Sequence, residues 1–421
     1  AAGNATALTI NQKALTITSD AQSTTYGTAL VLGTSGYTSS GLVNSDSITS
    51  VTLKQATNTT VPATQSAGTY SGSTDGILAS AAQGTGLSNY SITYVPGTLT
   101  INQKALTITS DAQSTTYGTA LVLGTSGYTS SGLVNSDSIT SVTLKQATNT
   151  TVPATQSAGT YSGSTDGILA SAAQGTGLSN YSITYVPGTL TINQKALTIT
   201  ANNDSKTYGD VKTYGSGSTA FTSSGLVNSE TIGSVTVTDT NSGGVNTAAA
   251  GGSYALTPSL ATGGTFSTSN YDITYTAGAL TVNKATLTVT AADKSRVYGD
   301  NNPSLTYGIT GYVNGENATS AGITGAPTIS TTATAASNVN TYTIASTANN
   351  LAAANYQFSY VDGTLTVNRR PVTVTADNQT RVYGEANPTL TYAVAADGTG
   401  TSRSMYNSQT LTGSVATAAV A

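Results

Sequence analysis

Residue types that carry most catalytic chemistry are scarce in this chain. Its 421 residues include no His and no Cys, which excludes Ser-His-Asp and Cys-His catalytic arrangements. Paired carboxylates could still act as acid and base. Residues 13–103 contain only Asp20, Asp46 and Asp75 as acids. Asp46 corresponds to Glu230 further along, but no pair of acids recurs. We therefore predict solvated surface acids, no enzyme activity and no cofactor.

The sequence also offers little for a metal ion. Calcium prefers six to eight oxygen ligands with several carboxylates, and zinc in proteins is held mainly by His and Cys. Acids are absent from three segments that join similar units, residues 97–109, 278–290 and 363–375. We expect no metal site. An isopeptide crosslink between Lys13 and Asn102 is not expected either, because Arg369 opens the last unit and cannot form one.

Tyrosine is the residue type with the most potential for binding. The chain has 24 Tyr, three Phe and no Trp. A Tyr ring has an apolar face and a polar tip, so an exposed one can stack on a sugar. Tyr37, Tyr70 and Tyr94 are our candidates for ligand stacking. The alternative is that tyrosines supply the core, with Tyr26 and Tyr90 half-buried at the ends of a unit and bonded to backbone.

The elements that would position these residues are repeated along the chain. The segment NYSITYVPGTLTINQKALTIT at 89–109 returns unchanged at 180–200, and looser copies follow at 270–290 and 355–375. The predicted organisation is a closing strand of a preceding repeat at 1–12, repeat 1 at 13–103, repeat 2 at 104–194, repeat 3 at 195–283, repeat 4 at 284–368 and an incomplete repeat 5 at 369–421. Repeats 1 and 2 are identical. A period near 90 residues is the size of a small domain.

Within a repeat, apolar residues recur at every second position. Leu15 and Ile17 alternate with Thr16 and Thr18, which is typical of a strand with one buried face. Pro96-Gly97 and Asp362-Gly363 indicate turns, and residues 40–47 could form a turn or a short helix. The fold class is therefore all-β, a tandem array of β-sandwich or β-grasp-like domains, and the pattern does not separate these two.

Neighbouring repeats are joined without a flexible spacer. Only Asn102-Gln103 separates the closing hairpin of repeat 1 from the opening strand of repeat 2. A short junction restricts hinge motion, whereas a Gly/Ser linker behaves as a coil. We expect an extended rod, with four and a half repeats spanning roughly 150 Å if each is as long as a ten-residue strand.

Composition excludes further classes of partner. The chain has 14 Lys plus Arg, no basic patch and a net charge of −4, so no nucleic acid is expected. No apolar run approaches transmembrane length. The absence of Cys favours a bacterial origin for an extracellular protein. The chain starts at Ala1 without a signal peptide, so we expect a segment of a longer protein.

Two motifs carry a resemblance to a known family. Tyr208–Asp210, VYGDNNPSLTY at 297–307 and VYGEANPTLTY at 382–392 form the opening motif, and NYQFSYVDGTLTVN at 355–368 forms the closing one. Repeats 1 and 2 depart from the pattern with Tyr26-Gly27-Thr28. The chain resembles the YDG/MBG-type tandem repeats of large bacterial surface proteins, including filamentous-haemagglutinin-like and biofilm-matrix adhesins. The resemblance implies a secreted or surface-anchored multi-repeat β protein.

Two functions follow from this reading as hypotheses. The first is a structural stalk of a bacterial surface or secreted adhesin, which extends an adhesive region from the cell for attachment or biofilm formation. The second is a set of weak polysaccharide-binding repeats in the biofilm matrix that gain avidity by number. Extracellular polysaccharide and host glycans are the expected ligands. Lateral self-association into filaments through an unpaired strand edge is a further expectation.

Overall fold

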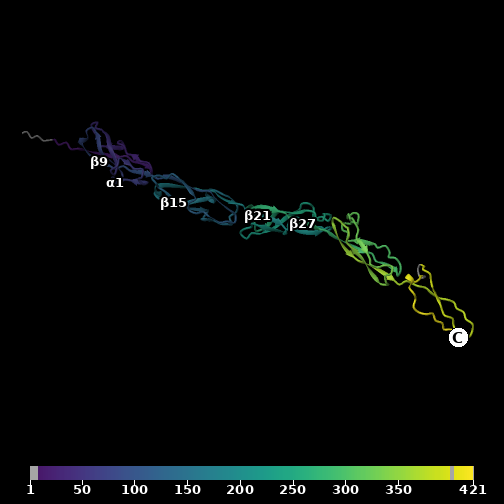
Figure 1. Ribbon diagram of the computed structural model, residues 1–421. Helices are drawn as coiled ribbons and strands as arrows, with labels where there is room; N and C mark the ends of the chain where they lie inside the picture. Colours follow the sequence, from purple (N-terminus) through teal and green to yellow (C-terminus); the bar gives the residue numbers. More distant parts are fainter. Residues whose placement is uncertain (1–7, 399–402, 421) are drawn as a thin grey trace, which may run out of the picture. The chain divides into compact units, whose positions relative to one another are not determined.

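The computed structural model describes residues 8–398 and 403–420, and almost all of its regular structure is β (Figure 1). Strands hold 47% of the residues and helices 5%, which confirms the all-β class and the tandem repeats. The chain forms two compact units. The first runs to Leu197 and includes Gly225–Thr231 and Thr265–Ile273, and the second holds Thr198–Ser224, Ile232–Gly264 and the residues from Thr274 on.

Repeat 1, in the first unit, is built from two three-stranded sheets and two strand pairs. One sheet has the order β4-β1-β9 and the other β2-β10-β7, and the pairs are β3-β6 and β5-β8. In each sheet the central strand has one parallel and one antiparallel neighbour. The elements are β1 (Lys13–Ser19), β2 (Gln22–Thr25), β3 (Leu30–Val31), β4 (Tyr37–Ser40), β5 (Ile48–Gln55), β6 (Thr60–Val61), β7 (Gly68–Tyr70), α1 (Gly72–Asp75), β8 (Ile77–Gly84), η1 (Leu87–Asn89), β9 (Tyr90–Val95) and β10 (Leu99–Asn102).

Repeat 2 has the same topology, as its identical sequence requires. Its elements are β11 (Lys104–Ser110), β12 (Gln113–Thr116), β13 (Leu121–Val122), β14 (Tyr128–Ser131), β15 (Ile139–Gln146), β16 (Thr151–Val152), β17 (Gly159–Tyr161), α2 (Gly163–Asp166), β18 (Ile168–Gly175), η2 (Leu178–Asn180), β19 (Tyr181–Val186) and β20 (Leu190–Asn193).

In repeats 3 and 4, the second three-stranded sheet and the strand pair beside it are joined into one four-stranded sheet. Their four-stranded sheets have the orders β22-β27-β25-β24 and β29-β34-β32-β31, beside three-stranded sheets β23-β21-β26 and β30-β28-β33. In repeat 3 the long β25 replaces the strand–helical turn–strand segment of repeats 1 and 2. The elements of repeat 3 are β21 (Lys195–Ala201), β22 (Asp204–Thr207), β23 (Phe221–Ser224), β24 (Ile232–Asp239), β25 (Tyr254–Gly264), η3 (Thr268–Asn270), β26 (Tyr271–Thr276) and β27 (Gly278–Asn283). Those of repeat 4 are β28 (Ala285–Ala291), β29 (Lys294–Val297), β30 (Tyr307–Thr310), β31 (Thr328–Ser330), β32 (Thr341–Thr347), β33 (Tyr356–Val361) and β34 (Gly363–Asn368).

The two ends of the chain carry less regular structure. The described part of repeat 5 contains β35 (Val374–Ala376), β36 (Tyr392–Val394) and η4 (Tyr406–Ser408). Of the closing strand predicted at 1–12, residues 1–7 lie outside the described residues, and residues 8–12 form no strand. The matching strand β10 is held between β2 and β7, and no described strand pairs with residues 8–12 in that way.

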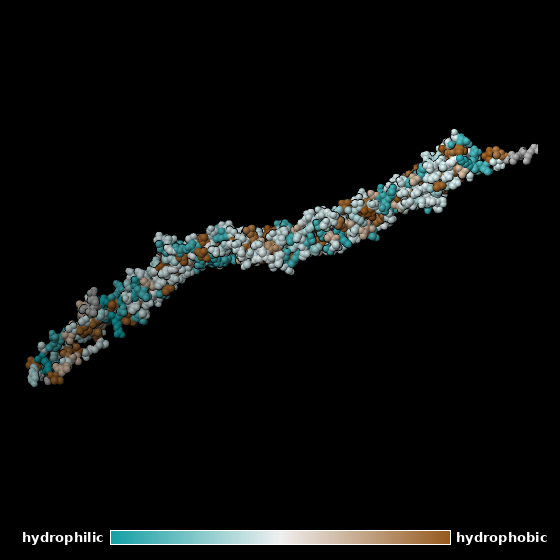
Figure 2. Space-filling model, turned by 180° about the vertical axis from the view of Figure 1, so that it is seen from behind, coloured by the Kyte–Doolittle hydropathy of each residue, from teal (hydrophilic) through white to brown (hydrophobic). Residues whose placement is uncertain are grey.

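The core follows the predicted alternation. Leu15 and Ile17 of β1 are fully buried, while Thr16 and Thr18 between them are partly exposed. Side chains of successive strand residues point to opposite faces, so each sheet turns its aliphatic face inward. On the face of the molecule in Figure 2, apolar residues are scattered among neutral and hydrophilic ones. None of the helices in the described ranges is long and apolar enough to cross a membrane.

Repeats 1 and 2 each contain a buried serine whose hydroxyl has no hydrogen-bond partner among the described residues. Within the described part of the chain, the hydroxyls of Ser19 and Ser110 are buried without a hydrogen-bond partner. Repeats 3 and 4 have Ala201 and Ala291 at this position, and both are buried. An unpaired buried hydroxyl loses its hydration without compensation, so the two serines destabilise their repeats.

We therefore expect the double variant Ser19→Ala/Ser110→Ala to stabilise each repeat by about 1 kcal/mol. Both serines are replaced because peptides from identical repeats report together in hydrogen exchange with mass detection. Slower exchange of β1 and β11 amides is the expected result. The control is Ser91→Ala/Ser182→Ala, which changes exposed serines on the neighbouring strands. Faster exchange in the first variant would contradict the assignment.

Candidate functional site

The Tyr-Gly pair that marks each repeat forms a protruding turn. In repeat 1 the turn follows β2, and the amide of Tyr26 donates to the carbonyl of Asn102 at the end of β10 (2.9 Å). The amide of Thr28 closes the turn on the carbonyl of Thr25 (2.9 Å). Gly27 has φ +84°, in the left-handed region that favours glycine. The turn therefore presents a Tyr ring and bare backbone at the end of the repeat.

The turn of repeat 1 lies against a second turn, which belongs to repeat 2. Asn135 and Ser136 have positive φ values of 56° and 63°, and the amide of Asp137 donates to the carbonyl of Val134 (3.0 Å). Two central residues with positive φ define a type I′ turn, which Asn favours at its first position. The segment that the sequence predicted to be either a turn or a short helix, residues 40–47 in repeat 1 and the matching residues 131–138 in repeat 2, therefore contains a turn.

A single carboxylate joins the two repeats. The Oδ2 atom of Asp137 accepts a hydrogen bond from the Tyr26 hydroxyl of repeat 1 (2.9 Å) and another from the Tyr181 hydroxyl of repeat 2 (2.8 Å). The Tyr181 oxygen in turn accepts from the amide of Val134 (2.9 Å). The two rings meet edge to face, with centroids 5.5 Å apart and an angle of 80°. Both geometries are favourable, and hydrogen bonds to a charged acceptor are stronger than neutral ones.

The glycine of the turn permits this approach. A Cβ atom on Gly27 would lie 2.6 Å from Cγ2 of Val134, far inside van der Waals contact. Any other residue at this position would push the repeats apart. The two residues of the Tyr-Gly pair therefore act together. Tyr contributes the ring and the hydroxyl, and Gly allows the backbone to approach the next repeat closely.

Further hydrogen bonds beside the carboxylate also join repeats 1 and 2. The side chain of Asn135 donates to the carbonyl of Ala63 (3.0 Å), and the amide of Ala67 donates to Oδ1 of Asn180 (2.9 Å). The joining residue Gln103 donates to the carbonyl of Ser179 (3.0 Å). Only Gln103 lies between strands β10 and β11.

The junction between repeats 2 and 3, within the first unit, has the same design. Glu230 accepts from the Tyr117 hydroxyl (2.7 Å) and from the Tyr271 hydroxyl. The rings are 5.5 Å apart at 81°, and a Cβ on Gly118 would lie 2.6 Å from Val227. The longer Glu side chain replaces Asp without changing the arrangement.

Within the second unit, repeats 3 and 4 meet in this way again. Glu316 accepts from Tyr208 (2.6 Å) and from Tyr356 (2.5 Å), whose rings are 5.4 Å apart at 80°. The two tyrosines belong to one apolar cluster with Val282 of repeat 3 and Leu287 of repeat 4. The hydrophobic core thus continues across this boundary.

Repeat 5 uses a neutral variant of the arrangement. Gln409 follows a turn with positive φ at Asn407 and Ser408, as the acids do in the earlier repeats, and its side-chain amide donates to the Tyr298 hydroxyl (3.0 Å). The Tyr298 ring meets Tyr406 at 5.3 Å and 76°. Arg370, largely buried, adds bonds from repeat 5 to the carbonyl of Tyr298 and to Asp300.

In each junction, the tyrosine that lies in the same repeat as the carboxylate has a raised pKa. Burial, followed by the hydrogen bond to the carboxylate, raises the pKa of Tyr271 and Tyr356 from 10.0 to about 12. Burial, together with the neighbouring Asp137, likewise raises the pKa of Tyr181 to about 12. A tyrosinate would be poorly hydrated and would face a negative charge. The junction therefore requires neutral tyrosines.

The prediction of solvated surface acids was wrong for one acid in each of repeats 1 to 4. Asp46, Asp137, Glu230 and Glu316 are partly buried, and each accepts a hydrogen bond from a tyrosine hydroxyl. Asp20 and Asp75 are exposed, as predicted. The joining segments of the chain hold no acid, but the folded junctions do, since the acid comes from a loop of the following repeat. Tyr90 is buried as the alternative proposed and bonds the Val43 amide (2.9 Å), whereas Tyr26 bonds a carboxylate of the next repeat.

The three candidate stacking residues lie away from these junctions. Tyr37, Tyr70 and Tyr94 are each partly buried. Their hydroxyls bond the backbone, as donors to the carbonyls of Ile48 (3.0 Å) and Ser66 (2.8 Å) and as acceptor from the amide of Ala82 (3.1 Å). Their role in sugar binding stays a prediction.

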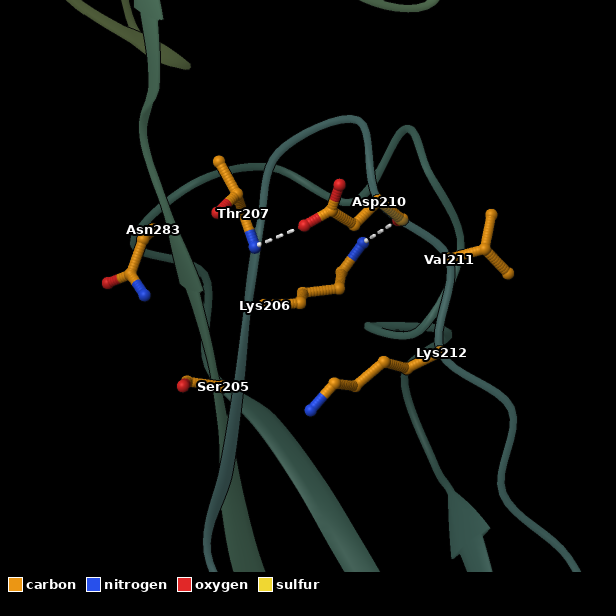
Figure 3. A pocket seen from close by; sticks show the side chains of 7 residues that line it. All are labelled: Ser205, Lys206, Thr207, Asp210, Val211, Lys212 and Asn283. Atoms are coloured by element: carbon orange, nitrogen blue, oxygen red, sulfur yellow. Dashed lines mark hydrogen bonds between the residues drawn. The ribbon is translucent and has the colours of Figure 1, made fainter.

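A buried cation that the sequence did not reveal supports one Tyr-Gly turn. Lys206 donates to the carbonyls of Asp210 (2.9 Å) and Val245, and burial lowers its pKa. Figure 3 shows Lys206 and Lys212 extending into the space enclosed by this loop, while Val211 points away. Lys212 pairs with Asp204. These contacts satisfy the loop internally and explain the lysines as structural.

The recurring Tyr-Gly turn and its receiving loop decide the family. Five consecutive segments match the MBG domain (YGX type), at residues 15–100, 106–191, 197–281, 287–366 and 372–421. The chain belongs to this MBG domain family. A comparison with curated proteins gives no match. The MBG repeats thus cover nearly the whole chain, as the resemblance implied.

The glycine of the turn makes the first testable prediction for the junction. Gly118→Ala places a methyl group against Val227 and should destabilise the boundary between repeats 2 and 3 by more than about 2 kcal/mol. Gly124→Ala is the matched control, since Gly124 has φ +74° but nothing within 4 Å of its Cβ position. The control should cost about 1 kcal/mol. Hydrogen exchange of the Val227 amide, in a peptide unique to repeat 3, reports the junction.

The second-site change Val227→Gly should restore much of the loss in Gly118→Ala, because it removes the Cβ atom and both Cγ atoms of Val227, which would lie 2.6–2.8 Å from the added methyl group. Equal effects of Gly118→Ala and Gly124→Ala would show that backbone strain alone is responsible, and would contradict the docking role of Gly118.

Alkaline pH should weaken the junctions. Since the folded-state pKa of Tyr181, Tyr271 and Tyr356 lies above the ordinary value of 10.0, folding holds these protons. Their contribution to stability is complete below pH 10 and is lost as pH rises through 12, by on the order of 2 kcal/mol for each buried tyrosine. Tyrosinate absorbance is the measurement. The difference between the parent chain and Tyr271→Phe should show a transition near pH 12, and one near pH 10 would contradict the buried, carboxylate-bonded geometry.

Proposed function

We propose that this MBG array is a spacer, or stalk, in a bacterial surface or secreted adhesin, where it extends an adhesive region from the cell for attachment or biofilm formation. The observation that carries this proposal is the junction built from the same parts at three successive boundaries. A spacer transmits position and force, and both require that each repeat be held to the next.

The junction suits that task physically. One residue separates the strands of neighbouring repeats, namely Gln103, Gln194 and Lys284. Gln103 and Gln194 each donate a hydrogen bond of 3.0 Å to a carbonyl of the following repeat, those of Ser179 and Ser269. Lys284 opens repeat 4 and donates a hydrogen bond of 3.0 Å to the carbonyl of Ala353 in the same repeat. Because the covalent link and the Tyr–carboxylate contact both join the two repeats, we infer that a repeat has little freedom to pivot on its neighbour. Restricted motion at each junction supports a stiff array, which the stalk function requires.

The distribution of chemistry along the array also supports a spacer. Repeats 1 and 2 are identical, so duplication adds length without adding a new site. The low charge limits nonspecific binding. Polysaccharide binding ranks second, because the hydroxyls of Tyr37, Tyr70 and Tyr94 already bond the backbone and leave ring faces as the main contact.

A pair of spin labels tests the mechanical premise. The chain has no Cys, so Thr59→Cys/Thr150→Cys places labels at exposed, matching positions of repeats 1 and 2 only. We expect a narrow distance distribution by electron–electron dipolar spectroscopy. Adding Gly27→Val should broaden it at least about twofold, because the side chain would clash with Val134. A broad distribution in the chain with Gly27 would contradict a stalk.

A titration of the full chain with matrix polysaccharides and host glycans separates the two functions. The spacer proposal expects no saturation at millimolar sugar. Saturable binding that is lost in Tyr70→Ala/Tyr161→Ala would favour the polysaccharide-binding alternative. Tyr383→Ala is the control, since this exposed tyrosine lies outside the candidate set.

A further inference from the structure

We propose that each repeat is a mechanical clamp, in which two pairs of parallel strands resist a pull along the chain. The inference rests on the proposed spacer function for the source of the pull, since an adhesin that holds a surface transmits tension through its stalk. Repeat 2 lies wholly within the first unit, between two other repeats, and shows the arrangement most completely. Its strands β11, β12, β19 and β20 are called the clamp.

Tension enters and leaves a repeat through its first and last strands. Strand β11 directly follows Gln103, and β20 ends at Asn193, one residue before β21 opens repeat 3. A pull along the array therefore draws the start of β11 and the end of β20 in opposite directions. The residues between β12 and β19 lie outside this path as long as the clamp strands hold together.

The clamp strands run side by side from one boundary of the repeat to the other. The first residue of β11 pairs with Tyr181, which contacts Tyr26 of repeat 1. Tyr117, which directly follows β12, bonds Glu230 of repeat 3, and its amide donates to the carbonyl of Asn193 at the end of β20 (2.9 Å). Strands β11 and β12 thus carry the chain from the first boundary to the second, and β19 and β20 follow the same course.

The parallel pairing of these strands decides how they respond to a pull. Strand β11 pairs with β19 over residues 104–109, and β12 pairs with β20 over residues 113–116. A pull along the array makes the paired strands slide past each other lengthwise. The bonds of a parallel ladder are evenly spaced, so all of them oppose this sliding together. Because a single bond contributes little in water, this sharing makes the repeat strong.

Side chains reinforce the clamp where the tension leaves the repeat. The side-chain amide of Asn193 donates to the carbonyl of Thr115 on β12 (3.2 Å), beside the bond from the Tyr117 amide. On the inner face of the clamp, Leu106 of β11 and Leu190 of β20 are fully buried. The inner side of both ladders is therefore shielded from water, which would otherwise replace strand bonds as they stretch.

Repeats 1 and 4 have the same pairing. In repeat 1, β1 is parallel to β9 and β2 to β10, and Asn102 donates to the carbonyl of Thr24 (3.3 Å) as Asn193 does to Thr115. In repeat 4, β28 is parallel to β33 and β29 to β34. Tension passes through the repeats in series, so each repeat bears all of it. A clamp is useful to the array only if it recurs in this way.

Pulling single molecules of the full chain in two directions tests the clamp. The chain has no Cys, so handles attached to introduced cysteines load only the repeat that carries them. Ala105→Cys/Gln194→Cys loads repeat 2 along the array. Ala105→Cys/Ser182→Cys draws the starts of two paired strands apart, because Ala105 is the register partner of Ser182. All three positions are exposed, so the fold should persist.

We expect the handles at 105 and 194 to require at least about twice the unfolding force of those at 105 and 182, at the same loading rate, because the clamp bonds then break together and not one after another. Equal forces, or a lower force along the array, would overturn the clamp. The spacer proposal fails separately, since it depends on the distances between spin labels, and a stiff junction does not require a strong repeat.

A second comparison changes one bond of the clamp. Gln113→Pro removes the amide that donates to the carbonyl of Thr189 (2.9 Å), at the first residue of β12, a position where sheets accept Pro. Gln113→Ala is the matched control, because both variants lose the side-chain bond to the carbonyl of Leu123 (3.2 Å) but only Pro loses the amide.

Along the array, the Pro variant should unfold at a force at least about 10% below that of the Ala variant, because one shared bond is missing. With handles at 105 and 182 the two variants should unfold at equal force, since the first bonds to break lie at the other end of the ladder. Equal forces along the array contradict the clamp. An equal loss in both directions also contradicts it, because that loss would reflect general destabilisation.

Discussion

The arrangement of neighbouring repeats depends on one carboxylate shared by two tyrosine hydroxyls. One hydroxyl belongs to the preceding repeat and the other to the repeat that supplies the acid. A carboxylate removed from water needs donors to offset its desolvation, and here two hydroxyls provide them from opposite sides of a boundary. Removing either tyrosine would leave the other contact with less support, so the repeats are linked through a group that neither holds alone.

The other features of the junction follow from this requirement. The ring of Tyr26 can reach Asp137 only if the chain after it passes close to Val134, and glycine at position 27 allows that approach. The type I′ turn aims the acid toward the boundary. The short link at Gln103 keeps the two surfaces in register. Asp, Glu and Gln all occur at the receiving position, so the geometry tolerates a change in length or charge when neighbouring contacts adapt.

The fold was largely predictable because its signals are local. The alternation of Leu15 and Ile17 with threonine records one buried face, and the copies of the Asn89–Thr109 segment record the tandem repeats. The junction was not predictable in the same way, because Tyr26 and Asp137 are separated by 111 positions. A usable signal existed in the first three Tyr-Gly pairs, each of which is followed one repeat later by a Val-Asn-x-Asp/Glu segment. Ser110 is the next inward position after Leu106 and Ile108, so the alternation indicates its burial, but the lack of a partner for its hydroxyl depends on the surrounding fold and left no signal in the sequence.

A double-mutant cycle on Tyr117 and Glu230 tests the shared carboxylate most directly. The unfolding free energy at the boundary of repeats 2 and 3 would be measured by hydrogen exchange for the parent chain, Tyr117→Phe, Glu230→Ala and the double variant. We predict a coupling energy of about 1 kcal/mol or more between the two side chains, because the phenol donates to this acid across the boundary. Additive effects, with a coupling near zero, would contradict the shared carboxylate and would leave packing, the flanking hydrogen bonds and the covalent link to hold the repeats together.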